Sequence, residues 1–258
     1  MPGYLTKQER IAISGVADLH IRSLLDNQQF SDPQGLAALV GISAATWPLF
    51  GLLWPSGAEL AARMGQRPVT AGERILEIGC GLGLASLVGH RRGADMTASD
   101  CHPLAGLFLA NNLRLNGLAP MKYRHGLWGE VAHPASPADG GPHLPASAPG
   151  VQAVEDSGHA ANDGSVDVSG RFDLIMGSDV LYERDDSGGL ARFIEDHTQP
   201  SAEVWIVDPH RGNRPAFNRR MAHLGFDLNE QRLDRLATPL QTAYRGRMLT
   251  YTRTAAAH

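Results

Sequence analysis

The sequence has little of what marks a secreted, metal-binding or nucleic-acid-binding protein. Its 258 residues include two cysteines, Cys80 and Cys101, too few for the disulfide framework of a small extracellular domain. Lys and Arg number 23 against 27 Asp and Glu, so the basic footprint of a nucleic-acid clamp is missing. The start, MPGYLTKQER, lacks the apolar core of a signal peptide. No histidine has metal-ligand spacing. We therefore expect a cytoplasmic protein without a metal site or a nucleic-acid partner.

One uncharged stretch, residues 34–58, is long enough to raise the question of a membrane span. A spanning helix needs about 20 predominantly apolar residues. Pro48 and Pro55, together with several glycines, interrupt any single apolar helix here. We expect no membrane association, and we assign residues 1–54 to an amino-terminal extension without a recognisable motif.

From residue 55 onward, short apolar runs alternate with helix-length amphipathic segments. Such alternation is typical of βαβ units, which build a doubly wound α/β sheet covered on both faces. The predicted strands are residues 74–79, 96–100, 121–126, 172–179, 202–209, 226–233 and 246–253. The predicted helices are residues 56–64, 84–92, 103–116, 189–197 and 215–224.

Residues 131–170 interrupt this pattern, because Pro, Gly, Ala and Ser dominate and neither Lys nor Arg occurs. A segment of this composition buries too little apolar surface to offset the entropy of ordering its backbone. We expect a disordered acidic insertion at a surface connection; a lid over the substrate is the alternative.

The strongest chemical signal is LEIGCGLGLAS, residues 76–86, where a predicted strand enters a glycine cluster and a helix leaves it. Glycines at such a turn let a ligand approach the backbone closely. Asp100 ends the next strand, where a carboxylate can accept hydrogen bonds from both ribose hydroxyls. The spacing E-x-G-x-G-x-G differs from the dinucleotide fingerprint G-x-G-x-x-G, and Glu77 suits a cationic ligand better than a pyrophosphate. S-adenosylmethionine, with its ammonium and sulfonium, is such a ligand.

Glu77 to Gly83 with Asp100 resembles motif I and its acidic partner in class I S-adenosylmethionine-dependent methyltransferases. Trp54-Pro55-Ser56, Leu127-Trp128-Gly129 and the segment Ser178 to Tyr182 resemble the methyltransferase-like protein-lysine methyltransferases, a group related to nicotinamide N-methyltransferase-like enzymes. The resemblance implies a Rossmann-like, doubly wound seven-stranded sheet, mostly parallel with one antiparallel strand near the C-terminus. The resemblance covers roughly Trp47 to Asp208, apart from the insertion, and we assign the methyltransferase domain to residues 55–258.

The resemblance also implies roles for individual residues. Glu77 and the glycine cluster would hold the methionine end of the cofactor, Asp100 the ribose, and Trp128 would pack beside adenine. Asp179 and Tyr182 would face the methyl acceptor and are the predicted catalytic residues. The predicted cofactor-binding residues are Trp54, Glu77, Gly79, Cys80, Gly81, Gly83, Asp100, Cys101, Trp128 and Ser178.

Several alternatives stay open on the sequence. Trp128 and Trp54 can be packing residues, Asp179 can cap a following helix, and the two thiols are expected to be structural. Asp179 is expected to orient the acceptor amine first, since its charge also favours the protonated amine. The predicted reaction is N-methyl transfer to a lysine of a protein. Three rivals remain: a small-molecule N- or O-methyltransferase, a nucleic-acid methyltransferase and a cofactor-binding protein without turnover. The second is disfavoured because residues 178–181 replace the N-P-P-Y or D-P-P-Y motif typical of that class. No oligomeric state is predicted.

Overall fold

The computed structural model describes residues 3–128, 166–182, 185–210, 212–237 and 243–255. Their centre is a seven-stranded sheet with the strand order β5-β4-β3-β6-β7-β9-β8. Its strands are β3 (Arg74–Ile78), β4 (Asp95–Asp100), β5 (Lys122–His125), β6 (Phe172–Ser178), β7 (Thr198–Asp208), β8 (Asp227–Arg235) and β9 (Tyr244–Arg253). β9 runs antiparallel to β7 and β8, and the other neighbours are parallel. The predicted mostly parallel sheet with one antiparallel strand is confirmed.

Helices cover both faces of this sheet, as the continuous apolar strands require. One face packs against α2 (Pro55–Gln66), α3 (Leu84–Arg91) and α4 (Ala105–Leu115), and the other against α5 (Gly189–His197) and α6 (Arg214–His223). Successive residues of β3 divide between the two layers: Ile75 lies in the first core and Leu76 in the second. The helices and strands predicted for residues 56–253 are therefore confirmed, with ends that differ by a few residues.

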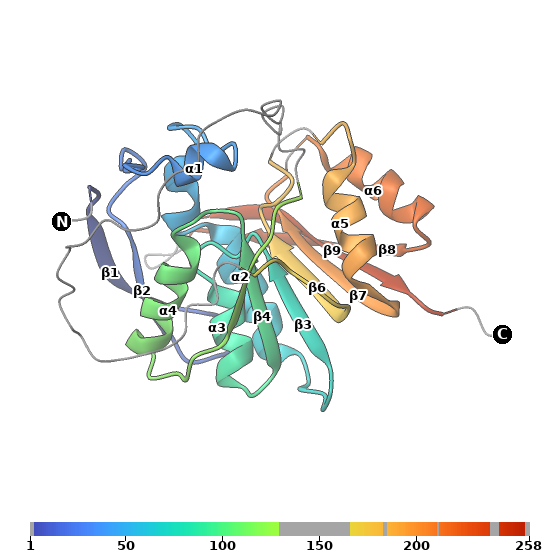
Figure 1. Cartoon of the computed structure of the whole chain (residues 1–258). Helices are drawn as coiled ribbons and strands as arrows, with labels where there is room; N and C mark the ends of the chain where they lie inside the picture. The colour runs from blue at the N-terminus through green and yellow to red at the C-terminus, as the bar shows by residue number, and fades with distance from the viewer. Residues whose placement is uncertain (1–2, 129–165, 183–184, 211, 238–242, 256–258) are drawn as a thin grey trace, which may run out of the picture.

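The amino-terminal segment contains elements that the sequence pattern did not indicate. β1 (Thr6–Ile11) and β2 (Leu19–Leu24) form an antiparallel hairpin, followed by α1 (Leu36–Leu39) and the 3₁₀ helix η1 (Trp47–Gly51). Figure 1 shows the hairpin beside α4, at the opposite end of the molecule from α5 and α6. Trp47 is 1% exposed and packs against the rings of Tyr4, Phe30 and Phe50. The segment thus shares the core of α2, α3 and α4.

The uncharged stretch at residues 34–58 is divided among α1, η1 and the start of α2. In the described part of the chain, no helix is both long enough and apolar enough to cross a membrane.

Most of the predicted insertion at residues 131–170 lies outside the described residues, which resume at Val166. His125 at the end of β5 donates its N–H to the Val166 carbonyl at 3.0 Å and accepts from the Val168 N–H at 3.0 Å. The chain therefore returns to the β5 edge of the sheet before it enters β6.

Candidate active site

A cavity of about 1170 Å³ opens where the parallel strands β3, β4 and β6 end. The carboxyl ends of parallel strands are the usual place for a ligand in a doubly wound sheet. Eleven of the twelve predicted site residues line it: Trp54, Glu77, Gly79, Cys80, Gly81, Asp100, Cys101, Trp128, Ser178, Asp179 and Tyr182. Gly83 does not.

The glycine turn after β3 explains this exception. Gly83 begins α3 with a φ of 73°, and a Cβ there would lie 2.5 Å from Leu109 of α4. Gly81 has a φ of 50°, and a Cβ there would lie 2.7 Å from the Phe50 carbonyl oxygen. Both positions need glycine because of the left-handed backbone and the close neighbour. Gly83 serves packing, whereas Gly81 faces the cavity.

Glu77 is the most deeply buried of the acidic residues that line the cavity. Its side chain is on the α2–α3 face of β3, and the residue is 3% exposed. The Ser86 N–H and hydroxyl both donate to Oε2, the N–H at 2.7 Å. Burial raises the pKa of Glu77 to about 7; the Ser86 bonds oppose this shift, and the nearby Asp100 charge adds to it.

Asp100 ends β4 and is 6% exposed. Its Oδ2 accepts from the Gly81 N–H at 2.8 Å, and its Oδ1 accepts from the His102 N–H at 2.8 Å. Burial raises the pKa of Asp100, and these two backbone donors act in the opposite direction. The carboxylate therefore ties the glycine turn to the loop after β4, with its remaining lone pairs available to a ligand.

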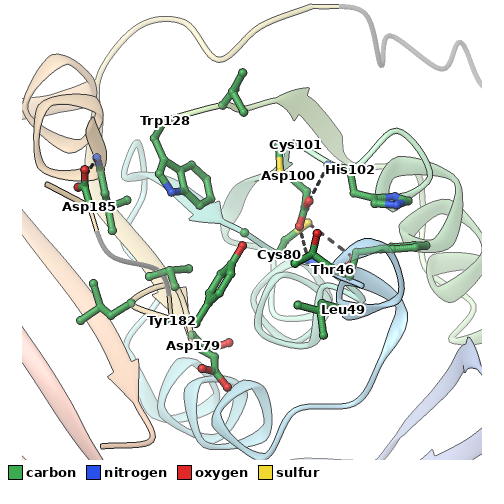
Figure 2. Close-up of a pocket in the computed structure, with 18 of the residues that line it drawn as sticks. Thr46, Leu49, Cys80, Asp100, Cys101, His102, Trp128, Asp179, Tyr182 and Asp185 are labelled. Atoms are coloured by element: carbon green, nitrogen blue, oxygen red, sulfur yellow. Dashed lines mark hydrogen bonds between the residues drawn. The ribbon is translucent and has the colours of Figure 1, made fainter. Parts of the chain in front are cut away.

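Trp128 and the two cysteines border the same space (Figure 2). The Trp128 ring packs against Phe193 at 5.9 Å between centroids, and it is so close to Gly79 that a Cβ there would lie 3.2 Å from the indole. Trp128 thus packs against Phe193 and also forms part of the cavity wall. Cys80 and Cys101 form no disulfide, and burial raises the pKa of the Cys80 thiol, which keeps it protonated.

Ser178 is the last residue of β6, Asp179 follows it directly, and Tyr182 comes next in the turn. Asp179 has a φ of 59°, a left-handed conformation that is uncommon outside glycine. Its N–H donates to the Val207 carbonyl at 2.8 Å, which fixes this conformation beside β7. Tyr182 is 46% exposed, and its ring points from this turn into the cavity in Figure 2.

The alternative that Asp179 caps a helix does not hold. The next helix, α5, begins ten residues later at Gly189. Its first N–H groups, those of Gly189 and Leu190, donate to the Asp185 carboxylate at 2.9 and 3.1 Å. Asp185 performs the capping role, and the Asp179 side chain lines the cavity.

Sequence reasoning missed one whole wall of the cavity. The amino-terminal segment contributes Thr46, Leu49, Phe50 and Leu52, next to the predicted Trp54. Trp54 itself donates its indole N–H to the Leu49 carbonyl at 2.9 Å, so it also fastens this wall. The uncharged, aromatic composition of residues 47–54 was the available signal, but nothing local shows what such a segment packs against.

The cavity suits a cationic nucleoside. Two buried carboxylates, Glu77 and Asp100, face it with raised pKa values. In the described part of the chain, neither has an ion-pair partner. A ligand that brings its own positive charge would stabilise both in the ionised form.

Comparison with known proteins points in the same direction. No family model matches the chain. An electron transfer flavoprotein beta subunit lysine methyltransferase of Danio rerio is 24% identical over 220 residues, which are 78% of this chain and 71% of that protein. A protein N-terminal and lysine N-methyltransferase, EFM7 of Yarrowia lipolytica, is 28% identical over 70% of this chain and 66% of its own length.

These relatives share a methyltransferase name, and the cavity contains the expected motif residues. The chain is similar in sequence to protein lysine methyltransferases. The buried acidic residues and the glycine turn of the cavity fit S-adenosylmethionine as a cofactor. The structure of a 16S rRNA N2 G1207 methyltransferase of T. thermophilus shares the methyltransferase fold, with a TM-score of 0.52 and 16% identity over 97% of this chain and 51% of that one.

Proposed function

We propose that this methyltransferase transfers the methyl group of S-adenosylmethionine to the side-chain amine of a lysine in a protein. Two relatives carry lysine methyltransferase in their names. The observation that carries the proposal is the pairing of Asp179 with the 46% exposed Tyr182 at the outer side of the cavity. An acid and an aromatic ring at an open rim suit an amine presented on a macromolecule, whereas a small substrate is usually enclosed.

The cofactor side of the proposal assigns one task to each residue. Glu77 would face the ammonium of the methionine part, Asp100 would accept from the ribose hydroxyls, and Trp128 would pack beside adenine. Cys80, Cys101, Ser178 and Trp54 would complete the walls. When bound, S-adenosylmethionine supplies an activated methyl group on its sulfonium.

The acceptor side must position a neutral amine, because an ammonium has no lone pair. A free lysine has a pKa of about 10.4, and an apolar surrounding lowers it. Asp179 would hold the amine by hydrogen bonds and direct its lone pair, while the face of the Tyr182 ring would contact the cation before it loses its proton. Such alignment can contribute ~7–11 kcal/mol to a displacement reaction.

The test uses purified protein, labelled S-adenosylmethionine and three acceptor pools: host-cell proteins, small metabolites and purified electron transfer flavoprotein beta subunit. Mass spectrometry should locate the label on lysine side chains of a protein. Label on an N-terminal α-amine would reassign the acceptor, label only in metabolites would support a small-molecule enzyme, and cofactor binding without label in any pool would support a non-catalytic role. An Asp179→Asn variant serves as the control for non-enzymatic labelling.

A further inference from the structure

Strand β2 of the amino-terminal hairpin exchanges hydrogen bonds with the side chains of Asn112 in α4 and of Asn116, the C-cap of α4. Asn112 and Asn116 are four residues apart and lie on one face of this helix. The Arg22 N–H donates to Asn112 Oδ1 at 2.8 Å, and the His20 N–H donates to Asn116 Oδ1 at 2.9 Å. Asn116 Nδ2 also donates to the His20 carbonyl at 2.7 Å. The side-chain amides of the two asparagines thus bond backbone groups of β2 that a neighbouring strand would otherwise bond.

Asn112 has a second partner that Asn116 does not share. Its Nδ2 donates to the carbonyl of Leu82, in the glycine turn, at 3.3 Å. Two backbone partners fix the orientation of the Asn112 amide. The Arg22 N–H can only donate, so it faces the amide oxygen, and the Leu82 carbonyl can only accept, so it faces the amide nitrogen. Asn112 is 0% exposed, so water cannot replace either bond.

A second connection joins the same two regions through η1. The Phe50 ring stacks on the His102 ring, with 3.6 Å between centroids and an angle of 12°. The His102 N–H bonds Asp100, and the Phe50 carbonyl occupies the space that a Cβ of Gly81 would need. Burial lowers the pKa of His102 to about 3, so this stacked ring is neutral.

We propose that Asn112 is a positioning residue that couples docking of the β1–β2 hairpin to the shape of the glycine turn, and thereby sets the affinity for S-adenosylmethionine. One amide thus bonds the glycine turn through Leu82 and β2 through Arg22, so that removing the Asn112 side chain loosens both at once. This inference concerns the cofactor and is independent of which acceptor is methylated.

Coupling of this kind is reciprocal. If the docked hairpin favours cofactor binding, then bound cofactor must favour the docked hairpin by the same free energy. The amides of β2 should therefore report on a ligand that binds at the far end of α4.

The decisive experiment compares Asn112→Ala with Asn116→Ala. Each variant loses bonds to β2, but only Asn112→Ala also releases Leu82. We expect the Kd for S-adenosylmethionine, measured by calorimetry, to rise about tenfold in Asn112→Ala and less than twofold in Asn116→Ala. KM for the cofactor should rise in parallel, with kcat at saturating cofactor within twofold of the wild type.

Hydrogen exchange on the unmodified chain provides a measurement that does not depend on a variant folding. Addition of S-adenosylmethionine should slow exchange of the His20 and Arg22 amides, and in Asn112→Ala this protection should disappear. Equal affinities of the two variants would overturn the proposal, and so would β2 amides that exchange at the same rate with and without cofactor.

Discussion

The cofactor side and the acceptor side of the cavity hold their acidic residues in different ways. Glu77 and Asp100 are 3% and 6% exposed, and backbone N–H groups of neighbouring segments donate hydrogen bonds to both carboxylates. Asp179 is only partly buried and its backbone is in the left-handed conformation, and the nearby Tyr182 is 46% exposed. One side is an enclosed, hydrogen-bonded site; the other is an open turn.

The difference matches what each side has to bind. The cofactor is the same molecule in every turnover, so a buried site with preset donors and acceptors can recognise it. An acceptor on the surface of another protein needs an entrance. Asp179, at this entrance, has a left-handed backbone, as is common for residues at functional sites that present a side chain at one angle.

The largest effect should come from the acceptor side. Replacing Asp179 with Asn keeps a side chain that tolerates the left-handed backbone but removes the charge. We expect turnover on the protein substrate to fall about 100-fold, with an unchanged Kd for S-adenosylmethionine. Single-turnover kinetics and calorimetry measure the two quantities.

Asp185→Asn is the matched control for this prediction, because Asp185 lines the same cavity while its carboxylate bonds the start of α5. Asn can also cap a helix, so this variant should keep normal turnover. An equal loss in both variants would mean that the cavity responds to net charge alone.

The second effect concerns the stability of the cofactor side. Glu77 has a pKa raised to about 7 in the folded protein against 4.5 as its ordinary value, so the folded state binds the proton more tightly. Stability of the cofactor-free protein should therefore fall as pH rises from about 4.5 to about 7, by about 3 kcal/mol from this residue. Glu77→Gln should remove this dependence and be the more stable protein at pH 8, yet bind S-adenosylmethionine more weakly.

Urea unfolding at several pH values measures this difference. A gap between wild type and Glu77→Gln that stays constant from pH 5 to pH 8 would show that Glu77 does not titrate in this range.

The third effect is on cofactor affinity at β4. Asp100→Asn should weaken binding of S-adenosylmethionine by about 1.5–3 kcal/mol, the scale of hydrogen bonds to a charged group. Asp95→Asn is the control on the same strand, since Asp95 forms an exposed ion pair with Lys122 at 2.7 Å. Calorimetry should show normal affinity for the control; unchanged affinity in Asp100→Asn would reject the ribose assignment.

The smallest expected effect distinguishes two reasons for a glycine, a left-handed backbone and a close contact with a neighbouring atom. Gly81 and Gly93 both have a positive φ, but a Cβ at Gly81 meets the Phe50 carbonyl and a Cβ at Gly93 meets nothing within 4 Å. Gly81→Ala should lower the free energy of unfolding by about 1 kcal/mol more than Gly93→Ala. Thermal unfolding measures this, and only Gly81→Ala should also weaken cofactor binding.

Local sequence was enough to predict the cofactor side because its parts are close along the chain. Glu77, Gly81 and Asp100 lie at the ends of two consecutive strands, and parallel pairing brings such ends together. Ser178 to Tyr182 line the same cavity, since they lie at the end of β6 or follow it, and β6 pairs directly with β3. The structure resolved the open alternative at Asp179, because its helix-capping role falls to Asp185.

The amino-terminal wall was beyond prediction from local pattern. β2 alternates apolar and polar residues only over residues 19–22, and its partners on one side are the side chains of Asn112 and Asn116. Bonds between residues about 90 apart leave no mark on the spacing of either segment. The predicted boundary between residues 54 and 55 remains a prediction, and residues on both of its sides line the cavity.

From residue 55 onward, the sequence by itself determined the order of strands and helices, the glycine turn and the acidic residues near the strand ends, because these depend on periodicity and on short-range backbone chemistry. Only the tertiary structure decided that the first 54 residues close the cofactor site and that Asn112 links them to the glycine turn. Side-chain bonds between distant segments form only after the sheet and helices have brought them together, so their partners are a property of the folded chain.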